Sequence, residues 1–267
     1  MTTVATYRAS RELFWHLTLR ELRSKYKRSF LGWAWSTVTP LATMAVYTIV
    51  FRAIIRIHIP PGKPSGLNLY ALYLLCALLP WTFIQVSVQG GIVSLIGNSN
   101  LIKKTYFPRE FLPAATVAST FVSHCIEMGL LLVALLAFGN FHALPFIPLV
   151  FVLMLFVALF ALGLGLMLSV LNVYFRDVEY LITIVFLVWM YLTPIIYPFS
   201  LVPHRYRGIA EVLNPMTDAV LAFRSMLYDG TTPRWLGFGY FVLVASVVFI
   251  IGMYVFSRLE GRLAEEL

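Results

Sequence analysis

FIPLVFVLMLFVALFALGLGLMLSVL, residues 146–171, carries no charged side chain over a length that crosses a bilayer as an α-helix. Five further apolar runs have a comparable length and lie at 31–51, 69–88, 111–138, 180–197 and 235–256. In lipid every backbone amide must be hydrogen-bonded within its own segment, so runs of this length are typical of membrane-spanning helices. The sequence therefore predicts an all-α polytopic membrane protein with six transmembrane helices.

The composition agrees with a protein that is largely surrounded by lipid. Hydrophobic residues make up 60% of the chain and charged residues 12%, whereas soluble domains carry about 25% charged residues. Six helices and their connections use nearly all of the 267 residues. We expect one transmembrane domain over residues 1–267, with a cytoplasmic helix in 1–28 and a six-helix bundle in 29–267, and no separate catalytic domain.

The basic residues indicate how the chain is oriented in the membrane. The net charge is +8, and most Lys and Arg residues precede the first apolar run, lie in 98–109, or follow the last run. An excess of Lys and Arg on short loops marks the cytoplasmic side, so both termini are predicted to be inside. In a membrane protein this charge sets topology, and we expect no nucleic-acid partner.

The segment before the first apolar run has the pattern of an amphipathic helix. Four apolar residues recur at helical spacing: Trp15, Leu19, Leu22 and Tyr26. A basic and polar arc, which includes Arg23, occupies another side of the same helix. The pattern predicts a cationic helix at the cytoplasmic interface, acting either as a membrane anchor or as a docking surface for a cytoplasmic partner.

Two connecting segments also have helical patterns. The stretch NSNLIKKTYFP, residues 98–108, predicts a short cationic helix that Asn and Ser cap and that Pro108 ends. The stretch 216–228 is too short and too polar to span a bilayer, and it is bounded by Pro215 and Gly230. We expect it to form an external or re-entrant helix at the outer face of the membrane.

Small residues within the apolar runs predict close helix contacts and a stretch that disfavours helix continuation. Ala161, Gly165 and Ser169 follow one another at intervals of four, a spacing that lets two helix backbones approach. The second run leads into Gly90, Gly91 and Gly97, glycines that disfavour continuation of the helix.

The third apolar run contains the ionisable pair His124 and Glu127, next to a polar stripe that includes Thr120 and Ser123. Ionisable groups within a span should face protein or water. Three interpretations are open for this pair: the lining of a conduit, a proton site, or an internal hydrogen-bond cluster that fixes helix packing.

Motifs for independent enzyme chemistry are missing from the sequence. There is no G-x-x-x-x-G-K-[ST] phosphate loop, since Gly62-Lys63 lacks both the upstream glycine and the following hydroxyl residue. The five histidines show no metal-ligand spacing, and Cys76 and Cys125 both lie within apolar runs. The sequence predicts a protein with no catalytic residues, no metal and no cofactor of its own.

Several short motifs, in order along the chain, resemble the permease subunits of ABC exporters for bacterial surface polysaccharides, of the O-antigen, teichoic acid, capsule and galactan type. They are RSKYKRSFLGWAW at 23–35, YFPREFLP at 106–113, FRD at 175–177, TPIIYP at 193–198, and LNP at 213–215 followed by Phe223-Arg224. The resemblance covers nearly the whole chain.

The resemblance implies one ABC exporter transmembrane domain that works as a homodimer in the bacterial cytoplasmic membrane, among membrane lipids. Two separate cytoplasmic ATPase subunits would bind ATP and Mg²⁺ and drive export of a polyprenyl-pyrophosphate-linked polysaccharide. It also assigns roles to four sets of residues in this sequence. Contact with the ATPase falls on Asn98, Ser99, Asn100, Leu101, Ile102, Lys103, Lys104, Tyr106, Phe107 and Pro108. The interface helix and lipid pyrophosphate site falls on Arg23, Lys25, Lys27 and Arg28, the external gate on Asn214, Pro215, Asp218, Phe223 and Arg224, and a helix junction on Arg176 and Asp177.

Two other functions are compatible with the sequence. One is an ABC exporter of small molecules or drugs on the same scaffold, for which we expect a narrow hydrophobic cleft instead of a large aromatic-lined channel. The other is a proton-coupled secondary transporter that uses Glu127 and His124 and needs no ATPase. A purely structural or assembly role is a third possibility.

Overall fold

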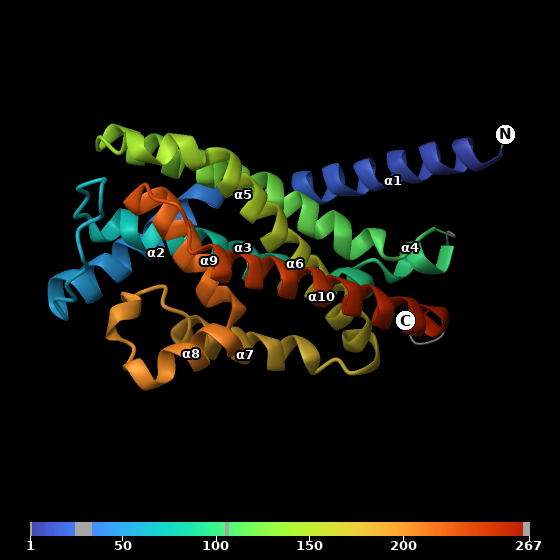
Figure 1. Ribbon diagram of the computed structural model, residues 1–267. Helices are drawn as coiled ribbons and strands as arrows, with labels where there is room; N and C mark the ends of the chain where they lie inside the picture. Colours follow the sequence, from blue (N-terminus) through green and yellow to red (C-terminus); the bar gives the residue numbers. More distant parts are fainter. Residues whose placement is uncertain (1, 25–33, 105–106, 264–267) are drawn as a thin grey trace.

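The computed structural model describes residues 2–24, 34–104 and 107–263, and every regular element in these ranges is a helix (Figure 1). This confirms the predicted all-α fold. Four predicted site residues, Lys25, Lys27, Arg28 and Tyr106, lie outside the described residues.

Five helical stretches are long and apolar enough to cross a bilayer, which confirms five of the six predicted spans. They are α2 (Ala34–Tyr47) continued by η1 (Thr48–Ile54), α3 (Tyr70–Gly97), α5 (Phe111–Ala137), η2 (Phe141–Phe146) continued by α6 (Ile147–Tyr174), and α10 (Trp235–Leu259). The other elements are α1 (Thr2–Ser24), α4 (Ser99–Lys104), α7 (Val178–Leu192), η3 (Phe199–Leu201), α8 (His204–Leu213), α9 (Pro215–Arg224), η4 (Ser225–Asp229) and η5 (Glu260–Arg262).

The long helices run side by side and give the bundle two distinct ends (Figure 1). The start of α1, the short helix α4 and the end of α10 lie toward one end, which we call the α4 end. The helices α8 and α9 and the loop between α2 and α3 lie toward the other, which we call the α9 end. Both ends of the described chain therefore lie on the same side of the bundle.

The fifth predicted span is shorter than the sequence suggests. The run 180–197 was expected to be helical throughout, but α7 has 15 residues, about 22 Å of helix against roughly 30 Å of hydrocarbon. The helix ends before Thr193-Pro194 because proline has no N–H to continue the hydrogen-bond ladder. The carbonyls of Pro194 and Ile195 are instead bound by the side chain of Arg224.

The core of the bundle depends on glycines that bring three helix backbones into direct contact. A Cβ atom on Gly91 of α3 would lie 3.1 Å from the Cα of Gly165 in α6. A Cβ atom on Gly252 of α10 would lie 2.1 Å from the carbonyl oxygen of Gly163 in α6. The predicted close approach at Gly165 is thus correct. Of the three glycines at which the sequence disfavours helix continuation, Gly90 and Gly91 do not end α3, which uses Gly91 for packing, whereas the helix does end at Gly97.

The outer helices are packed less tightly than this core. Almost all of α3 is buried, whereas most side chains of α2 and α7 are exposed on at least one face. The helices α3, α6 and α10 therefore form a tightly packed scaffold, and α2 lies against it with room for a recess.

The glycine contact predicts a large effect of one added methyl group. Gly252→Ala should destabilise the protein by about 1–3 kcal/mol, because the new Cβ overlaps the α6 backbone, which cannot rotate away. The midpoint of thermal unfolding of detergent-purified protein measures this. Gly129→Ala is the matched control, since a Cβ on Gly129 meets nothing within 4 Å. Equal midpoints for the two variants would contradict the role of the glycine contact.

Candidate functional site

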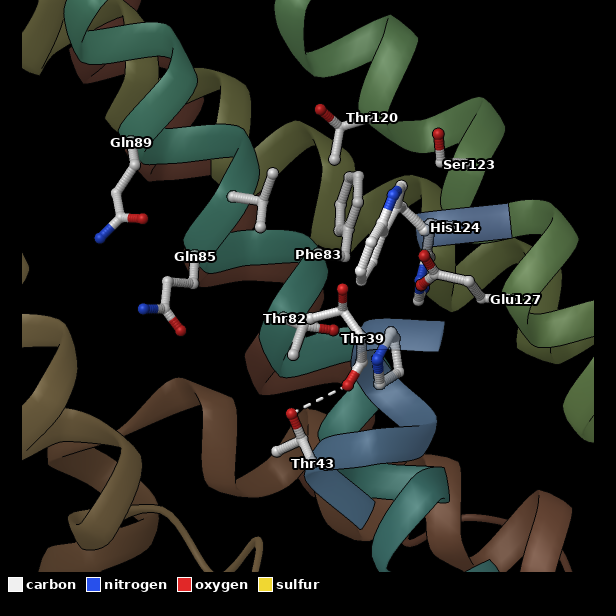
Figure 2. A pocket seen from close by; sticks show the side chains of 13 residues that line it. Thr39, Thr43, Thr82, Phe83, Gln85, Gln89, Thr120, Ser123, His124 and Glu127 are labelled. Atoms are coloured by element: carbon white, nitrogen blue, oxygen red, sulfur yellow. Dashed lines mark hydrogen bonds and ion pairs between the residues drawn. The ribbon is translucent and has the colours of Figure 1, made fainter. Parts of the chain in front are cut away.

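A polar recess lies between α2, α3 and α5 and has a volume of about 520 Å³. Figure 2 shows its lining, in which hydroxyl and amide side chains predominate, with one carboxyl group, one imidazole and two aromatic rings. The lining residues are Trp35, Thr39, Pro40, Thr43, Thr82, Phe83, Gln85, Val86, Gln89, Thr120, Ser123, His124 and Glu127.

The predicted pair His124 and Glu127 is brought together on the α5 wall of this recess. The Nδ1 atom of His124 lies 3.9 Å from Oε2 of Glu127. The imidazole is 1% exposed and stacks on the ring of Phe83 with centroids 4.8 Å apart. Neither ring nitrogen has a hydrogen-bond partner among the described residues. Buried polar groups are normally paired, so this buried imidazole, whose nearest charged neighbour is Glu127, is an exception on the α5 wall of the recess.

The rest of the stripe on α5 is largely satisfied by its own helix. The hydroxyls of Thr116 and Ser119 donate to the carbonyls of Leu112 and Thr116 at 3.1 and 2.9 Å. These bonds match the interpretation of an internal hydrogen-bond cluster, whereas His124 and Glu127 belong to the recess.

Sequence analysis missed the two glutamines that form the α3 side of the recess. Gln85 and Gln89 are half-buried and make no hydrogen bond to another described residue. The signal was present in the sequence, since two amides four residues apart in an apolar run share one helix face. Their free donors and acceptors point to a hydrated or hydroxyl-rich guest.

The aromatic residues of the spans divide into two groups that sequence alone does not separate. Trp81 packs edge-on against Phe186 and Trp189 at 5.8 and 5.5 Å, and this cluster is internal packing between α3 and α7. Trp35 and Phe83 belong to the recess lining.

An apolar cluster at the α4 end joins the short helices to the bundle. This α4-end cluster consists of Leu17, Leu95, Ile102, Phe107, Leu112, Ala115, Leu166, Val170, Val173, Phe256 and Leu263. It brings α1 and α4 into contact with the ends of α3, α5, α6 and α10. Helix α4 is therefore joined to the scaffold by packed apolar side chains.

Helix α1 packs along α5, but not with the predicted stripe alone. Leu22 is buried and Leu19 is half-buried, whereas Trp15 is 59% exposed. Phe14 and Leu17 contribute to the packed face instead, and the ring of Phe14 meets Phe111 of α5 at 5.8 Å. The regular spacing located the helix, but its contact face depends on where α5 lies.

The predicted ATPase-coupling residues divide into buried and exposed groups. Ile102 and Phe107 are buried in the α4-end cluster, whereas Asn100, Lys103 and Lys104 are exposed. The remaining described members, Asn98, Ser99, Leu101 and Pro108, are partly buried.

The predicted cap on α4 is formed differently. The side chain of Asn98 donates to the carbonyl of Ser94 at 2.8 Å and accepts a hydrogen bond from Arg20 at 2.6 Å. Asn98 thus ties α1 to the end of α3 with its side chain, while its backbone carbonyl accepts the first hydrogen bonds of α4.

The predicted helix junction lies between α6 and α7, but another residue holds it. Arg176 and Asp177 are both exposed, and no ion pair joins them in the part of the chain that the structure describes. Buried Asn172 makes the connection: its Nδ2 donates to the carbonyl of Ile92 and its Oδ1 accepts from the amide of Glu179, both at 3.3 Å. This single side chain links α3, α6 and α7.

Two of the predicted gate residues form a polar network at the α9 end. Arg224 is 3% exposed. Its guanidinium donates to the carbonyls of Tyr73, Pro194 and Ile195 and lies 3.7 Å above the ring of Tyr73. Asn214 accepts from the indole of Trp189 at 2.8 Å and donates to Thr193 at 2.9 Å. We call these two side chains and their partners the α9 network.

The helix α9 is more deeply placed than the sequence suggests. It begins at Pro215 and contacts α3, α6, α8 and α10, and Phe223 is fully buried. A helix expected at the outer face is therefore enclosed by protein on nearly all sides, because α3 and α10 provide apolar surfaces on both flanks.

Asp218 belongs to a charged group that joins α8, α9 and the start of α10. Arg234 binds Glu211 through both guanidinium nitrogens at 2.8 and 2.9 Å and lies 3.8 Å from Asp218. Burial and the nearby carboxylate of Glu211 raise the pKa of Asp218 and Arg234 lowers it, and the net result is a pKa of about 6. A Cβ on Gly237 would lie 2.2 Å from Oδ1 of Asp218, so this carboxyl group packs directly on the α10 backbone.

These features define a class: a polytopic membrane protein with a polar recess among its spans and short helices packed against one end of the bundle. Residues 12–228 match the ABC-2 type transporter family, and the chain belongs to this family. It is 27% identical to the O-antigen export system permease protein RfbA of Klebsiella pneumoniae, over 93% of this chain and 92% of that protein. It is 30% identical to RfbA of Myxococcus xanthus over 84% and 83%, and 23% identical to the polysialic acid transport protein KpsM of Escherichia coli over 91% and 92%.

The α9 network predicts that Arg224 cannot be replaced without loss of stability. Arg224→Met should lower the free energy of unfolding by about 2–4 kcal/mol, because it leaves buried carbonyls without donors. Arg224→Lys should also destabilise, since one ammonium group does not reach all three carbonyls. The midpoint of thermal unfolding in detergent measures the stability of both variants. Arg205→Met, at an exposed site on α8, is the control and should change it little. A stable Arg224→Met protein would refute the network.

Asp218 predicts a pH dependence with a defined sign. The folded state raises its pKa from 3.8 to about 6, so protonation favours folding. The contribution of Asp218 protonation to the stability of the folded protein is complete below about pH 4 and is lost as the pH rises through about 6. Between about pH 5 and pH 7 the wild-type protein should lose on the order of 1 kcal/mol of stability that Asp218→Asn does not lose. Denaturant titrations at the two pH values test this, with exposed Asp177→Asn as the control; parallel losses in wild type and Asp218→Asn would disprove it.

Proposed function

We propose that this chain is the permease half of an ATP-driven exporter that moves a polyprenyl-pyrophosphate-linked polysaccharide across the bacterial cytoplasmic membrane. The observation that carries the proposal is the polar recess, about 520 Å³ in volume, walled by α2, α3 and α5, each of which belongs to a stretch long and apolar enough to cross a bilayer. The names of the relatives, O-antigen and polysialic acid transport proteins, support a polysaccharide as the cargo.

The chemistry of the recess favours a glycan over a hydrophobic small molecule. Hydroxyl and amide groups of Thr82, Gln85 and Gln89 offer exchangeable hydrogen bonds to sugar hydroxyls. The rings of Trp35 and Phe83 offer apolar faces to sugar C–H groups. A narrow hydrophobic cleft, expected for a drug exporter, would not need this density of polar groups in lipid.

ATP-driven coupling is proposed to act through the α4 end. The chain has no phosphate-binding loop, so ATP and Mg²⁺ would be bound by two partner ATPases, one beneath each copy of a homodimer. The exposed Lys103 and Lys104 would contact the ATPase, and Ile102 and Phe107 would pass its motion to α5, α6 and α10 through the α4-end cluster. This arrangement places both termini in the cytoplasm.

Two further roles complete the proposal. The exposed Arg23 at the end of α1, together with Lys25, Lys27 and Arg28, would attract the lipid pyrophosphate. At the opposite end, Asn214, Pro215, Asp218, Phe223 and Arg224 would form the fixed base on which the more exposed helix α8 opens as an external gate.

Export in cells that lack their own polysaccharide permease tests the function. The chain, expressed together with its partner ATPase, should restore surface polysaccharide. Reversing the charge of Lys103 and Lys104 to Glu should reduce both ATPase association and export at least tenfold with normal membrane insertion, because the contact surface becomes repulsive. Lys63→Glu, on the loop near the α9 end, is the matched control.

Three results would contradict the proposal. Transport by the purified permease without nucleotide would favour the proton-coupled alternative with His124 and Glu127. Efflux of apolar drugs without glycan export would favour the small-molecule exporter. An active monomer would remove the dimeric pathway.

A further inference from the structure

We propose that the polymer handled by the recess is uncharged along its repeat units, as in a chain of neutral hexoses, and is not a polyanion. This inference rests on the proposed function and concerns the same site. It comes from the charges that the recess offers to a passing sugar chain.

Among the residues that the structure describes, the recess has no positive side chain with which to bind an anionic sugar. None of the 13 residues that line it is Lys or Arg. The one carboxyl group, on Glu127, lies beside His124 on the α5 side of the recess, whereas Gln85 and Gln89 extend from the α3 side, as Figure 2 shows. A protonated His124 would be neutralised by Glu127, which lies 3.9 Å away.

The cations elsewhere in the described spans are already engaged or lie at helix ends. Arg224, the most deeply buried of them, binds three carbonyls and the ring of Tyr73. Arg52, in the last turns of η1, donates to the carbonyl of Ile57 at 3.3 Å. Arg258 lies at the α4 end over the ring of Tyr254. None of these three lines the recess.

A polyanionic chain would therefore lose hydration in the recess without gaining a counter-charge, and it would pass a carboxyl group. Burial of a charge is unfavourable unless the charge is paired. A neutral sugar, in contrast, exchanges its hydrogen bonds to water for bonds to the half-buried amides of Gln85 and Gln89. The recess thus matches hydroxyl groups and disfavours carboxylates, sulfates and phosphates on the repeat unit.

Matched substrates test this inference directly. Two polyprenyl-pyrophosphate-linked hexasaccharides of the same linkage, one of glucose and one of glucuronic acid, differ only at C6. Proteoliposomes that hold the permease with its ATPase should move the glucose chain at least tenfold faster, scored as protection from an added glycosidase. The two substrates share the same lipid anchor, so the ratio of the two rates reports the glycan alone.

Variants in the recess test whether its charges cause the difference between the two transport rates. Glu127→Gln should reduce the ratio of the glucose rate to the glucuronic acid rate at least threefold, because it removes a negative charge. Gln89→Arg should reduce this ratio further, because it adds a positive charge. Glu127→Asp keeps the charge and should keep the ratio. Equal or faster transport of the glucuronic acid chain by the wild-type protein would overturn the inference and leave the proposed function intact. Transport of neither chain by an assembled complex that hydrolyses ATP would overturn both.

Discussion

The direct backbone contact between α6 and its two neighbours is the constraint on which the rest of the structure depends. In lipid, helix association gains little from the hydrophobic effect and relies on close van der Waals packing. Gly91 against Gly165, and Gly163 against Gly252, provide that packing because no Cβ holds the backbones apart. The three helices form one scaffold, and the more exposed α2 and α7 are left at its margin. The recess lies where α2 meets this scaffold, so its polar side chains are held by fixed walls on α3 and α5.

The two ends of the scaffold use different chemistry, in keeping with different tasks. At the α4 end an apolar cluster joins α1 and α4 to four long helices, and apolar contacts of this kind tolerate small sliding movements. At the α9 end Arg224 and Asn214 make directional hydrogen bonds to backbone and side-chain groups on α3 and α7. Directional bonds fix one geometry, so α9 acts as a rigid base. Helix α8 is more exposed and is attached mainly by the bonds from Arg234 to Glu211.

Much of the fold followed from the sequence, and the errors share one cause. Five spans and the helix after Pro215 were located from the sequence, although α3 extends nine residues beyond the run predicted to end at 88, because uncharged length and proline position are local properties. Gly91 disfavours helix continuation by its sequence, yet α3 passes through it because the glycine serves a contact with a helix more than seventy residues away. The charge pair expected at Arg176 and Asp177 was replaced by Asn172, whose partners lie on two other helices. Gln85 and Gln89 were overlooked because their role depends on what faces them.

The sequence by itself determined that this protein spans a membrane, that it carries no phosphate-binding loop, and that it belongs with polysaccharide export permeases by its ordered motifs. Those conclusions rest on the solvation of backbone in lipid and on residue identity, which need no three-dimensional information. Only the tertiary structure decided which polar residues share a recess and which helices pack against one another. It also showed why Arg224 has a structural role, since its guanidinium is occupied by backbone carbonyls and not by a ligand. Those properties arise from contacts between segments distant along the chain, and no local pattern of residues specifies them.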